Sequence, residues 1–464
     1  MPSTRALTLV VASALFMENL VGTVIATSLA PMARDLGVDP VTLKLAFTAY
    51  YVALAIFIPV SGWCAERFGA RTVFALAIAV FTLASVACAL AGSLAMLVAL
   101  RFVQGLGGAM MLPIARLILL RVVPKRELLA AMAWLAIPTL FAPIMGPPVG
   151  GFITTYYHWR GIFWLEVPVG VAGLAAALVL VPQARAAQPP ALDAKGAVLA
   201  GGGLALAIFG FTLAGSRSGE GLAAPATMAL GAVLLALYLR HARRSAAPIL
   251  DLGLLRIHTF RASITAGLLF RIATGALPFL LPLMLQVGFG MSAFQSGTLT
   301  FVSALGAVTM KLVATPILRR WGFRRVLAAN AVISSALVAA IALFGVATPH
   351  ALIVAVLLAG GFFRSLQFTS LNTLGYADID PARMSSATSF SAVVQQLSLS
   401  AGVALAALLL DLSRAVDGRS ALVSEDFGRA FVAVALISLA SLAVVARLAP
   451  DAGTEVSGHG AVEA

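Results

Sequence analysis

Apolar runs of about 20 residues or more alternate with short polar loops along almost the whole chain. A run of this length is sufficient to cross a bilayer as a helix. The runs lack the period-2 alternation of barrel strands, and in lipid the backbone must satisfy its own hydrogen bonds. We therefore predict an all-α integral membrane protein with fourteen transmembrane helices. The expected spans cover residues 7–31, 42–62, 72–92, 95–120, 129–154, 160–182, 194–214, 223–240, 259–287, 292–318, 325–346, 350–377, 385–411 and 428–449.

The composition supports the membrane interpretation, because the 464 residues are 61% hydrophobic and only 11% charged. A soluble domain of this size could not cover so much apolar surface with so few charges. The net charge of +13 resembles that of a nucleic-acid-binding protein, but the basic residues lie in short clusters between apolar runs. Such clusters set membrane topology, so we expect no nucleic-acid partner. Cys64 and Cys88 form neither a disulfide framework nor a metal-ligand spacing, and we expect no metal and no cofactor.

The basic loop residues also predict the orientation of the chain. Lys and Arg accumulate on one side if the N-terminus lies in the cytoplasm, and this excess favours two cytoplasmic termini and an even number of spans. The first apolar run is too long for the core of a signal peptide, so we interpret it as a retained helix.

An internal repeat predicts the domain organisation. The loops at 62–71 and 318–325 are similar, and the alignment of Gly69 with Gly322 gives an offset of 253 residues. Repeated halves around a midplane site are typical of secondary transporters; chance similarity between two short basic loops is the alternative. We expect one six-helix bundle at 1–185, a linker with two extra transmembrane helices at 186–250, a second six-helix bundle at 251–449 and a cytoplasmic tail at 450–464.

Two charged residues inside spans are candidates for proton coupling. Glu18 lies in the middle of the first apolar run, and ionisable groups at that depth usually mark an ion or substrate path. Arg101 and Gln104 share a face of the fourth span with Gly105 and Gly108. We predict that Glu18 is the partner of buried Arg101 and that the pair forms a proton switch. A fixed structural ion pair is the alternative.

Two motifs indicate conformational gating. In the loop after the second span, a glycine turn with flanking charges could latch helices together on the cytoplasmic side, although an ordinary basic loop is the alternative. In the fifth span, proline removes helix hydrogen bonds and glycine permits close packing, whereas a generic kinked helix is the alternative. The predicted gating residues are Gly62, Glu66, Arg67, Gly69 and Arg71 in the loop, and Gly146, Pro147, Gly150 and Gly151 in the span.

Polar residues inside other spans predict a substrate cavity. Arg271 lies near the middle of its span and corresponds to Glu18 under the repeat offset. Hydrogen bonds between helices are the alternative role of the amides. The candidate cavity residues are Gln104, Arg271, Gln286, Arg364, Gln367, Asn372 and Gln395.

Six segments together resemble motifs of the major facilitator superfamily, specifically its fourteen-helix drug/proton antiporters. They are GWCAERFGAR, RFVQGLGGAMMLPIARL, GPPVGG, HWRGIFWLEVPVG, LPFLLPLMLQVGFG and QFTSLNT. The resemblance covers nearly the whole chain and implies two six-helix bundles in the major facilitator fold. It further implies efflux of a small molecule, driven by inward proton flow through alternating access, in the bacterial inner membrane. We expect a monomer.

One departure from that family concerns the first span. Such antiporters typically carry an Asp where this chain has Val21, and Glu18 lies three residues earlier on nearly the same face. We predict that Glu18 takes over part of the proton role. The alternative is that the missing Asp weakens proton coupling.

Other classes of protein fit less well. An intramembrane enzyme would need a catalytic cluster inside the spans, and no H-E-x-x-H, G-x-S-x-G or paired-carboxylate arrangement occurs. The histidines lie in loops or at span ends: His158, His241, His258, His350 and His459. Basic residues outnumber acids inside the spans, which leaves export of organic anions or metal–organic anion complexes as an alternative. Uptake by a symporter of the same fold is another.

Overall fold

The computed structural model describes residues 4–123, 125–183, 192–213, 222–245, 248–380, 383–419, 421–457 and 459, and side chains within these ranges except at 4–6 and 125–140. The described residues form helices and loops without a strand. The first elements are α1 (Thr4–Val24), η1 (Ile25–Ser28), α2 (Leu29–Asp35), η2 (Pro40–Leu43), α3 (Lys44–Phe68), α4 (Ala70–Ala89), α5 (Leu94–Val122), α6 (Lys125–Tyr156), α7 (Gly161–Trp164), α8 (Glu166–Leu180), α9 (Ala194–Leu213) and α10 (Ala223–Ala242). They are followed by η4 (Leu252–Arg256), α11 (His258–Leu283), the π-helical turn η5 (Met284–Gly288), α12 (Ala293–Ile341), α13 (His350–Gly375), α14 (Met384–Val416), α15 (Ser424–Val445) and α16 (Thr454–Ser457).

Within the described residues, twelve helical segments are long and apolar enough to cross a membrane. The chain is therefore an all-α, multi-pass membrane protein, as the hydrophobic pattern predicts. The first span is longer than predicted and is built from three pieces, since a 3-10 turn at Ile25–Ser28 separates α1 from α2. The segment predicted as one helix over 160–182 begins with the short α7 and continues as α8.

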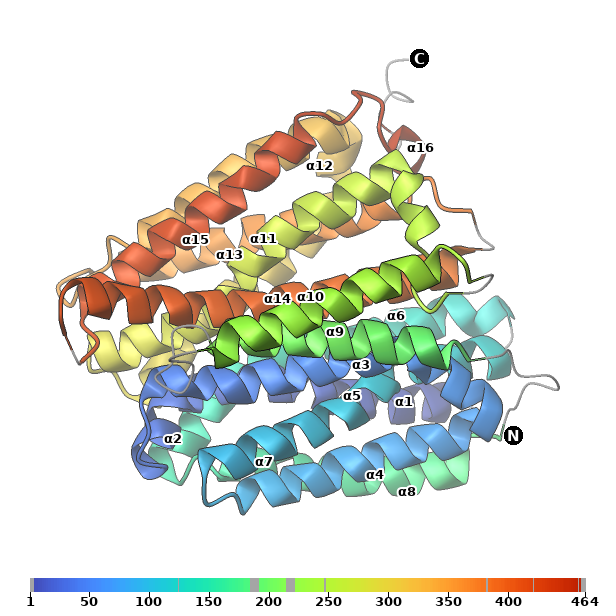
Figure 1. Ribbon diagram of the computed structural model, residues 1–464, viewed down its shortest axis with the longest axis horizontal. Helices are drawn as coiled ribbons and strands as arrows, with labels where there is room; N and C mark the ends of the chain where they lie inside the picture. The colour runs from blue at the N-terminus through green and yellow to red at the C-terminus, as the bar shows by residue number, and fades with distance from the viewer. Residues whose placement is uncertain are drawn as a thin grey trace. The chain divides into compact units, whose positions relative to one another are not determined.

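The chain divides into two compact units. Unit 1 comprises 1–211, 222–249 and 292–297, and unit 2 comprises 212–221, 250–291 and 298–464, each within the described ranges. The two helices expected between the bundles, α9 and α10, fall mainly in unit 1. They pack against each other at Gly203 and Gly231, while Gly201 of α9 contacts Ile56 of α3. Figure 1 shows α9 and α10 side by side.

Asp193, the residue just before α9, contacts His241 in the last turn of α10. Asp193 Oδ1 lies 2.6 Å from His241 Nε2, and the carboxylate accepts hydrogen bonds from the backbone N–H groups of Gly196 and Ile249. Burial alone would raise the pKa of Asp193, but these hydrogen bonds outweigh it and hold the pKa below its ordinary value.

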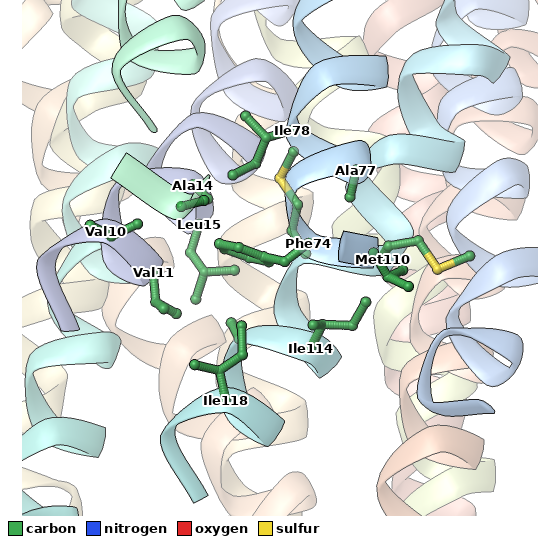
Figure 2. Close-up of a cluster of buried hydrophobic side chains, with 14 of the residues drawn as sticks. Val10, Val11, Ala14, Leu15, Phe74, Ala77, Ile78, Met110, Ile114 and Ile118 are labelled. Atoms are coloured by element: carbon green, nitrogen blue, oxygen red, sulfur yellow. The ribbon is translucent and has the colours of Figure 1, made fainter. Parts of the chain in front are cut away.

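The core of unit 1 forms where the apolar faces of α1, α4 and α5 meet. Phe74 of α4 is fully buried and lies between Leu15 of α1 and Ile114 of α5 (Figure 2). Helices α4, α5 and α8 run side by side in this unit (Figure 1). Long helices held by a large buried cluster give the unit a rigid frame for the polar groups described below.

Unit 2 is organised around α11, which packs against α13, α14 and α15. Glycines permit the closest approaches: a Cβ at Gly275 would lie 2.7 Å from Cα of Leu399, and one at Gly402 would lie 2.2 Å from the carbonyl oxygen of Ile272. Such contacts follow the small-residue rule for helices in membranes.

The two glycines aligned by the internal repeat share a backbone feature. Gly69 separates α3 from α4 with φ at 94°, and Gly322 breaks α12 with φ at 68°. Both values lie in the left-handed region that favours glycine. The repeat inferred from the sequence stays a prediction. The break at Gly322 divides the 49 residues of α12 into two helices, where the sequence predicts the spans 292–318 and 325–346.

Candidate functional site

A buried polar cluster lies in unit 1, where glycines of α5 bring two neighbouring helices very close. A Cβ at Gly105 would lie 2.5 Å from the carbonyl oxygen of Tyr50 on α3. A Cβ at Gly107 would lie 2.8 Å from the carbonyl oxygen of Ala77 on α4. The glycines that follow Arg101 and Gln104 in sequence therefore allow α3 and α4 to enclose both polar side chains.

Gln104 links a cation to an anion in this cluster. Its Oε1 accepts a hydrogen bond from Nη1 of Arg101 at 2.5 Å, and its Nε2 donates to Oε2 of Glu166 at 2.9 Å and to Oγ of Ser85 at 2.7 Å. Ser85 lies 2.6 Å from the same carboxylate oxygen. The amide thus presents its acceptor to the guanidinium and its donors to the carboxylate.

The guanidinium of Arg101 also stacks on an aromatic ring. Its Cζ lies 4.4 Å from the ring centroid of Tyr50, a cation–π geometry. Arg101 is 0% exposed, and within the described part of the chain its Nε and Nη2 have no hydrogen-bond partner. The cluster therefore contains a buried cation with spare donors.

Glu166 lies between this cluster and a small cavity. Glu166 is 2% exposed and is the first residue of α8. Its carbon atoms also line a cavity of about 180 Å³ between α1, α6 and α8. The other lining residues are apolar: Phe16, Met17, Leu20, Met145, Val149, Leu165 and Val169.

Glu18 occupies the neighbouring part of α1. Its Cγ would lie 3.5 Å from a Cβ at Gly108, and its backbone carbonyl is 3.4 Å from the hydroxyl of Tyr50. The side chain is half-buried, and its Oε2 is buried without a hydrogen-bond partner among the described groups. Arg116 is the cation that acts on it electrostatically.

The expected pairing of Glu18 with Arg101 is wrong for this structure. Arg101 instead bonds Gln104 and stacks on Tyr50, and the nearest anionic end of its network is Glu166. The physical reason is that Gln104 lies one helical turn from Arg101 and bridges it to α8. The proton-coupling roles of Glu18 and Arg101 stay predictions.

The candidate cavity residues of unit 2 include two arginines that bond neutral groups. Arg271 is 1% exposed, and its Nη2 donates to Oδ1 of Asn372 at 2.5 Å. Its Nε and Nη1 have no hydrogen-bond partner in the described ranges. Arg364 donates from Nη2 to Oγ of Ser303. Both cations are thus held by polar but uncharged side chains.

The other predicted cavity residues differ in environment. Gln367 is fully buried, and its Oε1 accepts from Nδ2 of Asn330 at 2.9 Å. Gln286 lies in the π-helical turn η5, and Gln395 is half-buried on α14. Gln104, assigned to a cavity from the sequence, lies fully inside the polar cluster of unit 1. Their roles as cavity residues stay predictions.

The glycine–proline motif of α6 packs tightly inside unit 1. A Cβ at Gly146 would lie 2.0 Å from Oγ1 of Thr23, and one at Gly150 would lie 2.6 Å from the carbonyl oxygen of Val24. A Cβ at Gly151 would lie 2.4 Å from the carbonyl oxygen of Ala293. A second close contact joins the same two helices: a Cβ at Gly297, near the start of α12, would lie 2.2 Å from the carbonyl oxygen of Pro147 on α6.

The predicted loop latch has one ion pair among its described side chains. Glu66 Oε1 lies 3.4 Å from Nη2 of Arg121 at the end of α5. Gly62 and Arg67 are exposed, whereas Arg71 is half-buried. Gly69 lies against the side chain of Gln183, whose amide donates to Thr72. The gating role of all these residues is still a prediction.

Comparison with known proteins identifies the family. The model of the Major Facilitator Superfamily matches residues 11–403. The chain belongs to this superfamily. It is 35% identical over 461 residues to the Escherichia coli (strain K12) protein named "Putative multidrug resistance protein MdtD", covering 98% of this chain and 97% of the relative.

Solved transporters share the fold of this major facilitator chain. A D-xylose-proton symporter matches with a TM-score of 0.66 and 14% identity over 94% of this chain and 97% of its own. The human organic anion transporter MFSD10 matches with a TM-score of 0.61 and 16% identity over 96% of this chain and 100% of its own. The family match and the 35%-identical relative show that the protein is a major facilitator transporter rather than an enzyme.

Sequence reasoning missed three members of the buried cluster: Tyr50, Ser85 and Glu166. Glu166 offered a signal, since it is an acid at the start of a strongly apolar run. Ser85 offered none, because a serine hydroxyl in a transmembrane helix usually bonds its own backbone. Tyr50 offered none, because a lone aromatic residue in a span usually packs in the core. Within the described residues, no group of three or more His, Cys, Asp or Glu side chains could hold a metal ion.

Proposed function

We propose that this transporter exports small molecules across the bacterial inner membrane in exchange for protons, by alternating access. The observation that carries the proposal is the Glu18 carboxylate, whose buried Oε2 has no hydrogen-bond partner among the described groups of a membrane-spanning helix. An acid in such a position is costly unless it serves proton or ion transfer. The likeness to the protein named for multidrug resistance, over nearly the whole chain, supports export.

We further propose fourteen transmembrane helices with both termini in the cytoplasm. The break at Gly322 divides α12 into two spans, and the 32-residue α6 adds another to the twelve apolar segments. An unbroken helix of 49 residues would be about 74 Å long at ~1.5 Å per residue, more than twice the thickness of the hydrocarbon core. The excess of basic residues in the loops assigned to the cytoplasm supports this orientation.

We assign the proton-coupling role to Glu18 and Arg101 and the gating role to the two glycine-containing motifs. The close packing of Gly146 and Gly150 against α1 supports a coupling between α6 and the helix that carries Glu18. The proposed organisation keeps the predicted bundles at 1–185 and 251–449, the linker helices at 186–250 and the tail at 450–464. The proposed working form is a monomer.

Transport into everted membrane vesicles tests this function. A proton gradient, acidic inside, is expected to drive accumulation of a cationic dye such as ethidium by vesicles that contain the wild-type protein. Glu18→Gln should abolish the gradient-driven part. Glu425→Gln is the matched control, since Glu425 is 74% exposed and far from the proposed machinery in sequence. Unchanged gradient-driven transport by Glu18→Gln would refute the assignment, and accumulation only under the opposite gradient would indicate a symporter.

A second candidate substrate class is organic anions, including metal–organic anion complexes. The observation that favours it is Arg271, which is buried and bonded to a neutral amide while two of its nitrogen atoms have no partner in the described ranges. An anionic substrate would supply the missing counter-charge. The fold neighbour MFSD10 is named as an organic anion transporter. Preferential transport of salicylate over ethidium, lost in Arg271→Gln, would favour this class.

A further inference from the structure

We propose that Glu166 is a second proton-binding carboxylate, which alternates with Glu18 as the counter-charge of Arg101. The inference rests on the proposed proton-coupling function of Glu18 and Arg101. It adds a residue to that site and states how charge is balanced there.

The need for a counter-charge comes from the burial of Arg101. A guanidinium does not lose its proton under physiological conditions, so this side chain stays cationic inside unit 1. It is 0% exposed, and a buried charge without an opposite charge is strongly destabilising. An ionised carboxylate in the same interior would offset this cost in each conformation.

Glu166 supplies this charge in the present arrangement. Its Oε2 accepts two hydrogen bonds, from Ser85 at 2.6 Å and from Gln104 at 2.9 Å. Gln104 carries the link onward to Arg101 at 2.5 Å. Hydrogen bonds to the charged form favour ionisation. The neutral amide of Gln104 donates to the Glu166 carboxylate and accepts from the Arg101 guanidinium. It therefore couples the two charges, although they are not in direct contact.

Glu18 is the alternative counter-charge. Its buried Oε2 has no hydrogen-bond partner among the described groups, which suits the protonated, neutral form in this arrangement. Tyr50 connects the two acids: its ring stacks on Arg101, and Glu18, Arg101 and Glu166 all act on it electrostatically. Because Nε and Nη2 of Arg101 are also unpaired within the described part of the chain, the guanidinium has donors available for a second carboxylate.

The remaining surroundings of Glu166 contain few titratable groups. On α3 there is Tyr50, on α4 the buried thiol of Cys88, and on α5 Arg101. The α1 and α6 side chains that share its cavity are apolar. Glu18 is faced by Arg116 of α5 and by Tyr50 of α3. Protonation of Glu166 would therefore leave Glu18 as the acid that balances Arg101 together with Arg116. The protein would take up one proton at Glu166 as it releases one at Glu18, with no net change in buried charge.

Infrared difference spectroscopy of the purified full chain tests this exchange. Labelling glutamate with ¹³C separates its carboxylic-acid carbonyl bands from those of aspartate, and the bands are recorded as a function of pH. Glu166→Gln should remove the band that protonated Glu166 gives at low pH. It should also weaken the Glu18 band about tenfold or more at neutral pH, because Arg101 then keeps Glu18 ionised. Glu166→Asp should retain a band from the new carboxyl group. The control Glu425→Gln should leave both buried bands unchanged.

A second pair of variants keeps the test valid if Glu166→Gln does not fold. Ser85→Ala removes one of the two donors to Glu166, so the Glu166 band should strengthen at neutral pH. Gln104→Leu breaks the bridge, and in that background a change at Glu166 should no longer alter the Glu18 band. The proposed exchange would be overturned if, with Gln104 unchanged, the Glu18 band were the same in the wild-type protein and in Glu166→Gln.

The infrared measurement needs no transported compound, so the two proposals fail separately. If vesicles show no proton-driven export but the bands respond as expected, the proposed function is wrong and the charge exchange stands. If export occurs but the Glu18 band does not change when Glu166 is replaced, the proposed charge exchange is wrong and the proposed export stands.

Discussion

Replacement of Gly150 by alanine tests whether the packing of α6 against α1 is as close as the structure indicates. A Cβ at this position would lie 2.6 Å from the carbonyl oxygen of Val24 and 2.8 Å from Oγ1 of Thr27. Ordinary contact begins at 3.4 Å, so the nearer atom is 0.8 Å too close. That atom belongs to the backbone, where the helix changes to the 3-10 turn η1, and it cannot rotate away.

Two effects of opposite sign determine the size of the change. Alanine is favoured over glycine inside a helix by about 1 kcal/mol. Overpacking a well-packed interior costs about 1–3 kcal/mol, and the upper end applies where backbone must move. We therefore expect Gly150→Ala to lower the free energy of unfolding by about 2 kcal/mol, which corresponds to a few degrees in the midpoint of thermal unfolding.

A thiol-reactive fluorescent dye can measure this midpoint in detergent, because Cys88 is fully buried and becomes reactive on unfolding. Gly173→Ala is the matched control: this glycine lies in α8, and its added Cβ would make an ordinary 3.7 Å contact with Oγ of Ser13. The control should unfold at or above the wild-type temperature. If Gly150→Ala were as stable as Gly173→Ala, the close approach of α6 to α1 would be refuted.

Three further changes give distinct outcomes. Gly322→Ala should lower the unfolding midpoint by the equivalent of about 1–2 kcal/mol, because alanine is strained at a φ of 68°; an unchanged midpoint would contradict the break in α12. Asp35→Asn should lose about 1 kcal/mol or less, since Asp35 accepts hydrogen bonds from Trp159 and Arg160, and the loss should shrink at high salt. The lowered pKa of Asp193 adds stability that is complete above about pH 4 and is lost as the pH falls through that lowered pKa. Asp193→Asn should therefore flatten the acid side of a plot of unfolding midpoint against pH, and a parallel curve would exclude this contribution.

The membrane architecture could be predicted from the sequence because long apolar runs carry a strong signal. The break at Gly322 was predictable as well, since its loop repeats the pattern around Gly69. Local irregularities were not predictable: nothing in the run from 7 to 31 indicates that Ile25–Ser28 forms a 3-10 turn. This turn lies where Gly150 of α6 packs, a contact between distant parts of the chain that the pattern of one apolar run does not reveal.

The candidate site was only partly predictable, for a related reason. Helical spacing correctly grouped Arg101 with Gln104, because residues three apart share a face. Spacing within one helix cannot reveal which other helix supplies the counter-charge. Whether Glu18 or Glu166 is linked to Arg101 depends on the close helix packing at the α5 glycines and on the orientation of the Gln104 amide. Both features arise only when the helices of unit 1 pack together.

The charges of the two units bear on what could be transported and what would drive it. In the described residues, unit 1 contains the buried acid Glu166 and the half-buried Glu18. In unit 2 the buried Arg271 and the half-buried Arg364 are bonded to Asn372 and Ser303, which are neutral. Exchange of one entering proton for one departing monovalent cation moves no net charge, so the membrane potential cannot drive it. Exchange of one proton for a departing monovalent anion moves two charges, worth about 4.6 kcal/mol per 100 mV. Collapsing the potential with valinomycin and potassium should therefore leave one-for-one export of ethidium intact but strongly reduce export of salicylate. Equal sensitivity of both would mean that these arginines do not select the charge of the substrate.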